Sequence, residues 1–183
     1  MKNLFKVFAA IVVISLFSTI VKAQVTLTGN HAGAELVKVL TIVNTTPLHF
    51  GVIGITSGTA GSVLMSTAGL RTTGAATTTI INSGTQKTVA LFNLTGTATD
   101  TYSISLPATI AVSTGEGGGN FATTISALMV KVDDATETIA AGATGTLSSL
   151  GASSFLLSGT LNIAAAQAIG VYTGTYDVTV DYN

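Results

Sequence analysis

The sequence predicts an all-β protein, an antiparallel sandwich built from many short strands. Three observations support this class. Runs rich in β-branched and aromatic residues recur along the chain, clusters of Gly, Ser, Thr and Asn separate them, and helical periodicity is nearly absent. Only residues 162–170, "NIAAAQAIG", predict a brief helix, because this stretch is rich in Ala and ends on Gly.

The predicted strands begin near the N-terminus. Residues 25–29 alternate Val and Leu with Thr, and residues 35–43 form a β-branched run that contains one lysine. Two short strands follow at 47–53 and 61–66, each bounded by Gly or Pro. Residues 88–96 are apolar on both faces, which is typical of a central strand.

Three further segments, residues 101–107, 127–134 and 155–163, show which of their faces is buried. Apolar side chains recur at every second position in each, and such a period of two indicates a strand with one face in the core. We expect these buried faces to carry Tyr102, Ile104, Leu106, Leu128, Val130, Val132, Phe155, Leu157, Leu161 and Ile163.

The first residues predict a secretion signal. Lys2 and Lys6 precede an apolar core at 7–17, and small residues near position 23 predict cleavage after Ala23. An uncleaved anchor is the alternative, but the apolar run is about 15 residues long, short of the roughly 20 that span a bilayer. We expect a signal peptide at 1–23, one secreted domain at 24–183 and no stable membrane span after cleavage.

Composition limits the partners and the compartment. After removal of the signal, four basic residues face eight acidic ones, a net charge of about −4 that argues against nucleic-acid binding. There is no Cys, hence no disulfide. Only 8% of residues are charged, against roughly 25% in ordinary globular chains. A subunit packed into a polymer or matrix fits this composition, and so does a secreted domain rich in Thr, Ala and Gly.

No metal or cofactor site is predicted. His31 and His49 are the only histidines, so a zinc site would need two carboxylates from distant loops. Asp133 and Asp134 close a strand, with Glu137 nearby, and could bind calcium together with loop carbonyls. A solvated turn is the favoured interpretation, because no loop with alternating acids follows.

No catalytic residues are predicted either. Asp177 and Asp181 share a strand face but lie about 13 Å apart along it, too far for a glycosidase-type carboxylate pair. The Gly-rich residues 115–120 lack the lysine of a phosphate-binding loop, and no serine lies in a nucleophile-elbow context. We therefore expect a protein that is not an enzyme.

The sequence ends with "GVYTGTYDVTVDYN", residues 170–183, in which apolar residues or Gly occupy every second position from Tyr172 to Tyr182. This alternation predicts a strand with one buried face. The strand either closes the protein's own sheet or presents an edge to another chain. The residue pattern leaves both possibilities open.

Three segments carry a resemblance to known proteins: "PLHFG" at 47–51, "FNLTGTATDTYSISLP" at 92–107 and "GVYTGTYDVTVDY" at 170–182. Over most of its mature length the chain resembles a bacterial secreted family known as domain of unknown function 4402. The tail, with Gly170 fourteenth from the end and a penultimate Tyr182, also resembles that of chaperone–usher pilus subunits.

The resemblance implies an immunoglobulin-like or pilin-like β-sandwich at the bacterial surface. In pilus subunits the tail docks on a periplasmic chaperone, and the N-terminal extension of the next subunit fills a gap in the sheet. Val25 and Leu27 would be the donor residues here, with residues 35–43 preferred as the domain's own first strand. The implied assembly edge is Gly170, Tyr172, Tyr176, Val178, Val180 and Tyr182.

Two functions follow as hypotheses. The first is a secreted structural or surface subunit, fimbria-like, that assembles with itself or with other surface subunits through strand edges. The second is a binding module or adhesin that recognises a glycan or a surface. The second predicts exposed aromatic residues on loops, whereas the Tyr residues lie within strand patterns and Trp is absent.

Overall fold

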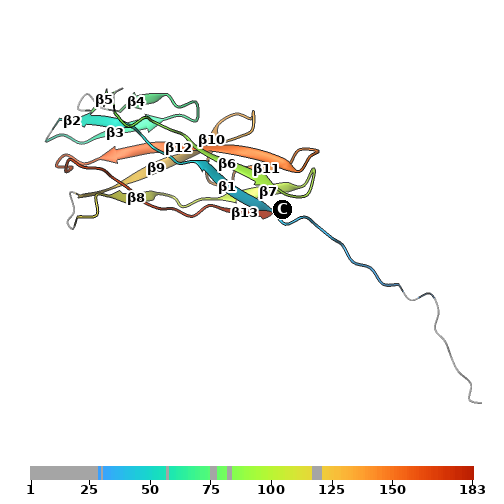
Figure 1. The fold of residues 1–183 in the computed structure, drawn as a ribbon. Helices are drawn as coiled ribbons and strands as arrows, with labels where there is room; N and C mark the ends of the chain where they lie inside the picture. Colours follow the sequence, from blue (N-terminus) through green and yellow to red (C-terminus); the bar gives the residue numbers. More distant parts are fainter. Residues whose placement is uncertain (1–28, 30, 57, 75–77, 82–83, 117–120) are drawn as a thin grey trace, which may run out of the picture. The chain divides into compact units, whose positions relative to one another are not determined.

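The computed structural model describes residues 29, 31–56, 58–74, 78–81, 84–116 and 121–183 (Figure 1). The chain divides into two compact units, Met1–Leu36 and Val37–Asn183. The part of the first unit that the structure describes, residues 29 and 31–36, forms neither helix nor strand. The predicted strand at 25–29 lies outside the described residues, apart from Gly29.

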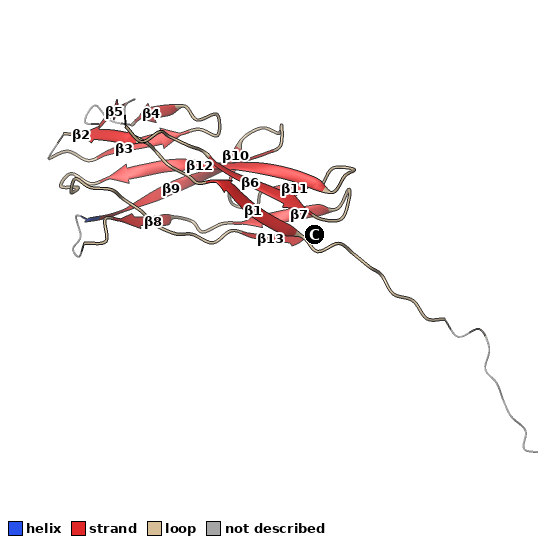
Figure 2. Cartoon of the chain, viewed as in Figure 1, coloured by secondary structure: helices blue, strands red, loops and turns tan. Residues whose placement is uncertain are grey.

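The second unit is built from antiparallel strands, and Figure 2 shows strand and loop in it apart from one short helical stretch just before β9. None of the helices in the described ranges is long and apolar enough to cross a membrane. The all-β antiparallel class is confirmed. The strands are β1 (Thr41–Thr46), β2 (Val52–Ile55), β3 (Gly61–Met65), β4 (Arg71–Thr73), β5 (Thr78–Ile81), β6 (Ala90–Thr95), β7 (Thr101–Ser105), β8 (Ile110–Ser113), β9 (Ala122–Val132), β10 (Thr138–Ile139), β11 (Thr144–Thr146), β12 (Ala152–Ile163) and β13 (Thr179–Tyr182).

The longest strand, β12, is the centre of the main sheet (Figure 1). One edge of β12 pairs with β9, and its other edge pairs first with β6 and then with β3. Beyond these neighbours β1 pairs with β6, and β4 pairs with β3. Every one of these ladders is antiparallel, so a single sheet runs from β1 through β12 to β9.

A second, smaller sheet has the order β11-β7-β13. Its central strand β7 places Tyr102 and Ile104 in the core, as the alternation predicts, and pairs with β13 from Thr179 to Tyr182. An isolated bridge between Ser113 and Thr173 joins the C-terminal residues to the end of β8. Strands β8 and β10 pair with β9 of the main sheet, and β2 and β5 form a separate two-stranded sheet.

The core lies between the inner faces of these sheets. Phe92 of β6 and Phe155 of β12 stack with ring centroids 4.8 Å apart. Of the predicted core residues Leu106, Val132 and Leu161 are half-buried. The others are buried, which confirms the alternation argument: Tyr102, Ile104, Leu128, Val130, Phe155, Leu157 and Ile163.

Strand β9 begins earlier than predicted because a bulge interrupts its alternation. Between Ser158 and Thr160 of β12 the partner residue on β9 moves from Met129 to Ser126, so β9 carries one extra residue. Ala127 has a φ of 45°, a left-handed conformation suited to such a bulge. The bulge lets both Ile125 and Leu128 face the core, which a strict period of two forbids.

Several expectations about strand and helix limits were wrong. Of the strand predicted at 47–53 only the last two residues belong to β2, and in the alternating tail only Thr179–Tyr182 form a strand. The first strand begins at Thr41 rather than at residue 35, so residues 35–40 precede the sheet. No helix forms at 162–170, because β12 continues to Ile163 and the Asn162 side chain donates hydrogen bonds to Thr124 and Ser126 on β9. Pairing with β9 therefore outweighs the helical preference of the alanines that follow.

Candidate assembly groove

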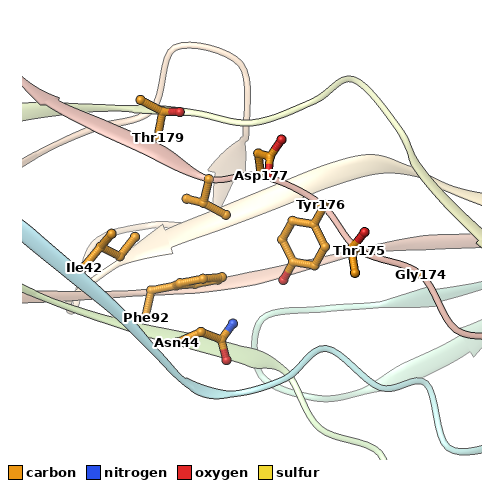
Figure 3. A pocket seen from close by; sticks show the side chains of 9 residues that line it. Ile42, Asn44, Phe92, Gly174, Thr175, Tyr176, Asp177 and Thr179 are labelled. Carbon is orange, nitrogen blue, oxygen red and sulfur yellow. The ribbon is translucent and has the colours of Figure 1, made fainter.

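A groove of about 620 Å³ runs between β1 and the C-terminal segment, which we define as residues 170–183 (Figure 3). Figure 3 shows Ile42 and Asn44 of β1 on one side and residues of the C-terminal segment on the other, with Phe92 between them. The lining residues are Ile42, Asn44, Phe92, Gly174, Thr175, Tyr176, Asp177, Val178 and Thr179.

The topology explains why a groove lies here. In chain order, β1, β6, β7, β9, β12 and β13 pair as the first six strands of an immunoglobulin sandwich, with β1-β6-β12-β9 in one layer and β7-β13 in the other. The seventh strand of that sandwich would pair with the outer edge of β13. Within the described ranges of this chain, no strand occupies that position.

Both walls of the groove therefore present backbone edges. Among the described residues, the only ladder that β1 makes is with β6, and the only ladder that β13 makes is with β7. No ladder joins β1 to residues 174–182 in the part of the chain that the structure describes. Unpaired N–H and C=O groups along an edge are a template for pairing with another strand.

The floor of the groove belongs to the core. Phe92 is only 4% exposed, and Ile42, Tyr176 and Val178 pack against the same core while remaining half-buried. A strand laid in the groove would remove the remaining apolar surface of these three side chains from water. Such burial contributes about 25 cal/mol for each Å² covered.

Tyr176 has an unusual position in this lining. Its hydroxyl oxygen is buried, and no hydrogen-bond partner for it exists among the described residues. Burial raises the pKa of the Tyr176 phenol, because the charged phenolate would lose its hydration. An unpaired buried hydroxyl costs about 1–3 kcal/mol, so this site is not optimised for the stability of the isolated chain.

At one end of the groove Tyr182 ties the two walls together. Its hydroxyl donates a hydrogen bond to the Lys38 carbonyl at 2.8 Å and accepts one from the Thr97 backbone N–H at 2.7 Å. The hydroxyl lies directly against Gly96, where any side chain would collide with it. This contact connects β13 to the residues before β1 and to the turn after β6.

Near the other end, the C-terminal segment lies against β8. Thr173 and Ser113 exchange two backbone hydrogen bonds of 2.9 Å. A side chain at Gly174 would collide with the Ala111 carbonyl, and one at Gly170 would approach the Thr114 side chain to 2.7 Å. Both glycines thus allow the segment to pass close to its neighbours.

The predicted assembly residues fall into separate places. Tyr176 and Val178 line the groove, Tyr182 closes its end, and Val180 pairs with Ile104 within the small sheet. Tyr172 is held locally instead: its hydroxyl donates to the Ala168 carbonyl and accepts from Gln167, both at 2.7 Å. The role of these residues in assembly, Gly170 included, stays a prediction.

Sequence reasoning missed the opposite wall and the floor. Ile42, Asn44 and Phe92 lie in segments predicted as strands, but nothing in their local pattern places them beside the C-terminal segment. The predicted donor residues, Val25 and Leu27, lie outside the described residues.

The other candidate sites are used within the fold. His49 accepts a hydrogen bond from the Gly51 N–H at 2.8 Å through Nδ1. Asp133 accepts hydrogen bonds from the Ser153 hydroxyl and the Ser154 N–H, both at 2.7 Å, and Glu137 accepts one from the Thr67 N–H. In the ranges that the structure describes, no three His, Asp or Glu side chains group as metal ligands.

One comparison identifies relatives of the chain. The profile of a family described as Domain of unknown function (DUF4402) matches residues 40–182, a range that includes β1, the C-terminal segment up to Tyr182 and all residues that line the groove. No curated protein matches the chain.

Proposed function

The chain belongs to the family described as Domain of unknown function (DUF4402), and we propose that it is a structural subunit of a surface or extracellular assembly. The observation that carries the proposal is the open groove between β1 and the C-terminal segment. An added strand would pair with edges on both sides and cover Ile42, Tyr176 and Val178. Strand addition of this kind is an established way for sheets to bind extended polypeptides.

A second copy of the chain supplies the strand in this proposal, from its N-terminal segment, residues 24–36. Because β1 begins only at Thr41, more chain precedes the sheet than the sequence pattern predicts. Apolar side chains just before β1 are exposed, Leu36 at 95% and Val39 at 74%. Val25 and Leu27 add an alternating apolar pair further upstream.

The anchoring of Lys38 favours a second copy over the same chain. The Lys38 N–H donates to the Thr97 hydroxyl at 3.0 Å, and the Lys38 carbonyl accepts from Tyr182. These bonds hold the chain just before β1 begins. A segment that folded back into its own groove would have to reverse direction just before this anchored residue.

We also propose that the subunit is secreted and that a periplasmic chaperone binds it before assembly. The basic start and apolar run of residues 1–17 support secretion, and a periplasmic chaperone that lends a strand to the same groove before assembly fits this route. The function is mechanical and includes no catalytic step. An adhesin role gains no specific support, since the exposed large hydrophobic residues described are all aliphatic.

The experiment compares unheated and boiled samples of the cell-surface fraction on a denaturing gel. Strand-locked polymers give a ladder in the unheated lane that collapses on boiling to one band of mature size. We expect Asn44→Trp to abolish the ladder, because Asn44 lines the groove and a bulky side chain occupies the place of the added strand.

The matched control is Asn93→Trp. Asn93 lies on the neighbouring strand β6, where it pairs with Val43 of β1. It is exposed and does not line the groove, so its replacement should leave the gel ladder intact. A single monomer band of the unsubstituted protein in both lanes would refute the proposed function. Equal loss of the ladder in both variants would show that the groove has no special role.

A further inference from the structure

An incoming strand in the groove meets a problem of register. The predicted donor "VTLTG", residues 25–29, repeats an apolar and a polar residue with a period of two. A slip by one residue would turn the apolar side chains outward and is strongly disfavoured. A slip by two residues restores the same pattern, so alternation alone does not select one register.

The groove has a closed end that distinguishes such registers. Its lining extends along the C-terminal segment from Gly174 to Thr179 and includes no residue beyond Thr179. Past this point the Tyr182 side chain crosses from β13 to the Lys38 carbonyl and the Thr97 N–H. The distance from Gly174 to Thr179 along an extended chain is about 17 Å, room for a strand of five or six residues.

The Tyr182 side chain is held firmly in this position. Its hydroxyl uses both its donor and its acceptor capacity, and the missing side chain of Gly96 leaves the space in which the hydroxyl lies. The backbone on either side of it is also paired, through Tyr182 to Tyr102 and through the Asn183 N–H to the Thr101 carbonyl at 3.1 Å.

We infer that Tyr182 is a positioning residue that stops the added strand at this end of the groove and so selects one register. The inference rests on the proposed function and specifies how the partner strand is recognised. A strand that slid two residues further would have to displace the ring and break both hydrogen bonds of its hydroxyl. Slips in the other direction would leave groove residues next to Thr179 uncovered.

The experiment maps the register of the added strand by disulfide formation between introduced cysteines. The chain has no Cys of its own, so no native thiol competes. One copy of the full mature chain carries Thr26→Cys, between Val25 and Leu27. A differently tagged copy carries a cysteine at Thr175, Asp177 or Thr179, which are exposed and two residues apart. Directly opposite residues on adjacent strands have Cβ atoms about 5 Å apart and diagonal ones about 7 Å, so only one acceptor position should cross-link well.

We expect the cysteine-containing protein that keeps Tyr182 to cross-link predominantly at one of the three positions. Tyr182→Ala should lose this preference and spread the disulfide over neighbouring positions. Tyr182→Leu, which keeps an apolar side chain against the sheet, serves the same test if the alanine variant does not fold. Tyr182→Phe removes the hydrogen bonds but keeps the ring, and should retain the preferred position.

Two results would overturn the inference while leaving the proposed function intact. One is a disulfide that still forms at a single, unchanged position in both Tyr182→Ala and Tyr182→Leu, since another residue would then stop the strand. The other is a ladder of polymers with no Thr26→Cys disulfide at any groove position, since the strand would then come from another segment. The absence of a gel ladder for the unsubstituted protein would instead refute the proposed function itself. A cysteine in place of the exposed Thr144 on β11 controls for random collisions.

Discussion

The hydroxyls of Tyr102 and Ser153 lie 2.7 Å apart and connect the two sheets of the sandwich. Tyr102 belongs to β7 of the small sheet, and Ser153 belongs to β12 at the centre of the main sheet. The Ser153 hydroxyl also donates to the Asp133 carboxylate at 2.7 Å, so it accepts the hydrogen bond that the Tyr102 hydroxyl donates. A chain of hydrogen bonds therefore runs from the buried Tyr102 of the small sheet to Asp133, just after β9.

Replacing Ser153 with alanine should destabilise the fold. The variant leaves the fully buried Tyr102 hydroxyl without its partner, which costs about 1–3 kcal/mol of unfolding free energy. Urea denaturation followed by circular dichroism measures this loss. Ser149→Ala in an exposed turn is the matched control and should leave the unfolding midpoint unchanged. A Ser153→Ala midpoint equal to that of the control would contradict the prediction.

Stability should fall in alkaline solution. Burial raises the pKa of Tyr102 and of Tyr176 above the ordinary value of 10.0, and the nearby Asp133 adds to the rise at Tyr102 while the Ser153 hydrogen bond opposes it. The unfolded chain therefore releases these protons first. The contribution to stability is complete below pH 10 and is lost as the pH rises through the folded-state pKa.

Urea midpoints measured from pH 8 to pH 11.5 check this dependence. We expect Tyr176→Phe to give a shallower decline above pH 10 than the unsubstituted protein, because it removes one of the two titrating groups. Tyr172→Phe offers a comparison at another position of the C-terminal segment. An identical decline in the Tyr176→Phe variant and the unsubstituted protein would show that Tyr176 does not contribute.

Gly174→Ala should displace the C-terminal segment from β8. The new Cβ would overlap the Ala111 carbonyl oxygen, and backbone atoms there have little freedom to move. We expect a loss of roughly 1–3 kcal/mol, the range for overpacked sites, together with a weaker surface ladder. Gly33→Ala is the control, because nothing lies within 4 Å of a Cβ at that position. Equal melting temperatures for the two variants would refute this account.

Phe92→Ala tests whether the groove floor is also part of the core. Phe92 is buried and stacks on Phe155, so truncation should cost about 3–5 kcal/mol. Leu64→Ala, at a partly exposed position of β3, should cost far less. Thermal unfolding of the two variants gives the comparison, and similar melting temperatures would show that Phe92 does not stabilise the sandwich as proposed.

Local alternation predicted the strand faces well. Tyr102 and Ile104 on β7, and Phe155 and Leu157 on β12, are buried as their period of two indicates. The same reasoning failed where the backbone departs from regular pleating. The bulge at Ala127 hid the first half of β9, and the β-branched residues at 35–40 did not join the sheet.

The groove could not be predicted because its parts come from distant segments. Tyr176 and Val178 belong to the predicted edge, but Ile42 and Phe92 reach the same groove only through the pairing of β1 with β6. The alternation placed Tyr182 on the predicted assembly edge but did not predict the contacts of its hydroxyl. Its hydroxyl binds Lys38 and Thr97 at the groove end, a relationship that no alternation pattern encodes.

The sequence by itself determined the all-β class, the buried faces of most strands and the family, because these depend on local periodicity and on short motifs. Tertiary structure alone decided which edges remain unpaired among the described residues, since pairing depends on contacts between residues far apart in the chain. The tail's alternation is equally compatible with a closing strand and with an open edge. The structure shows that it is both: β13 pairs with β7 on one side and borders the groove on the other.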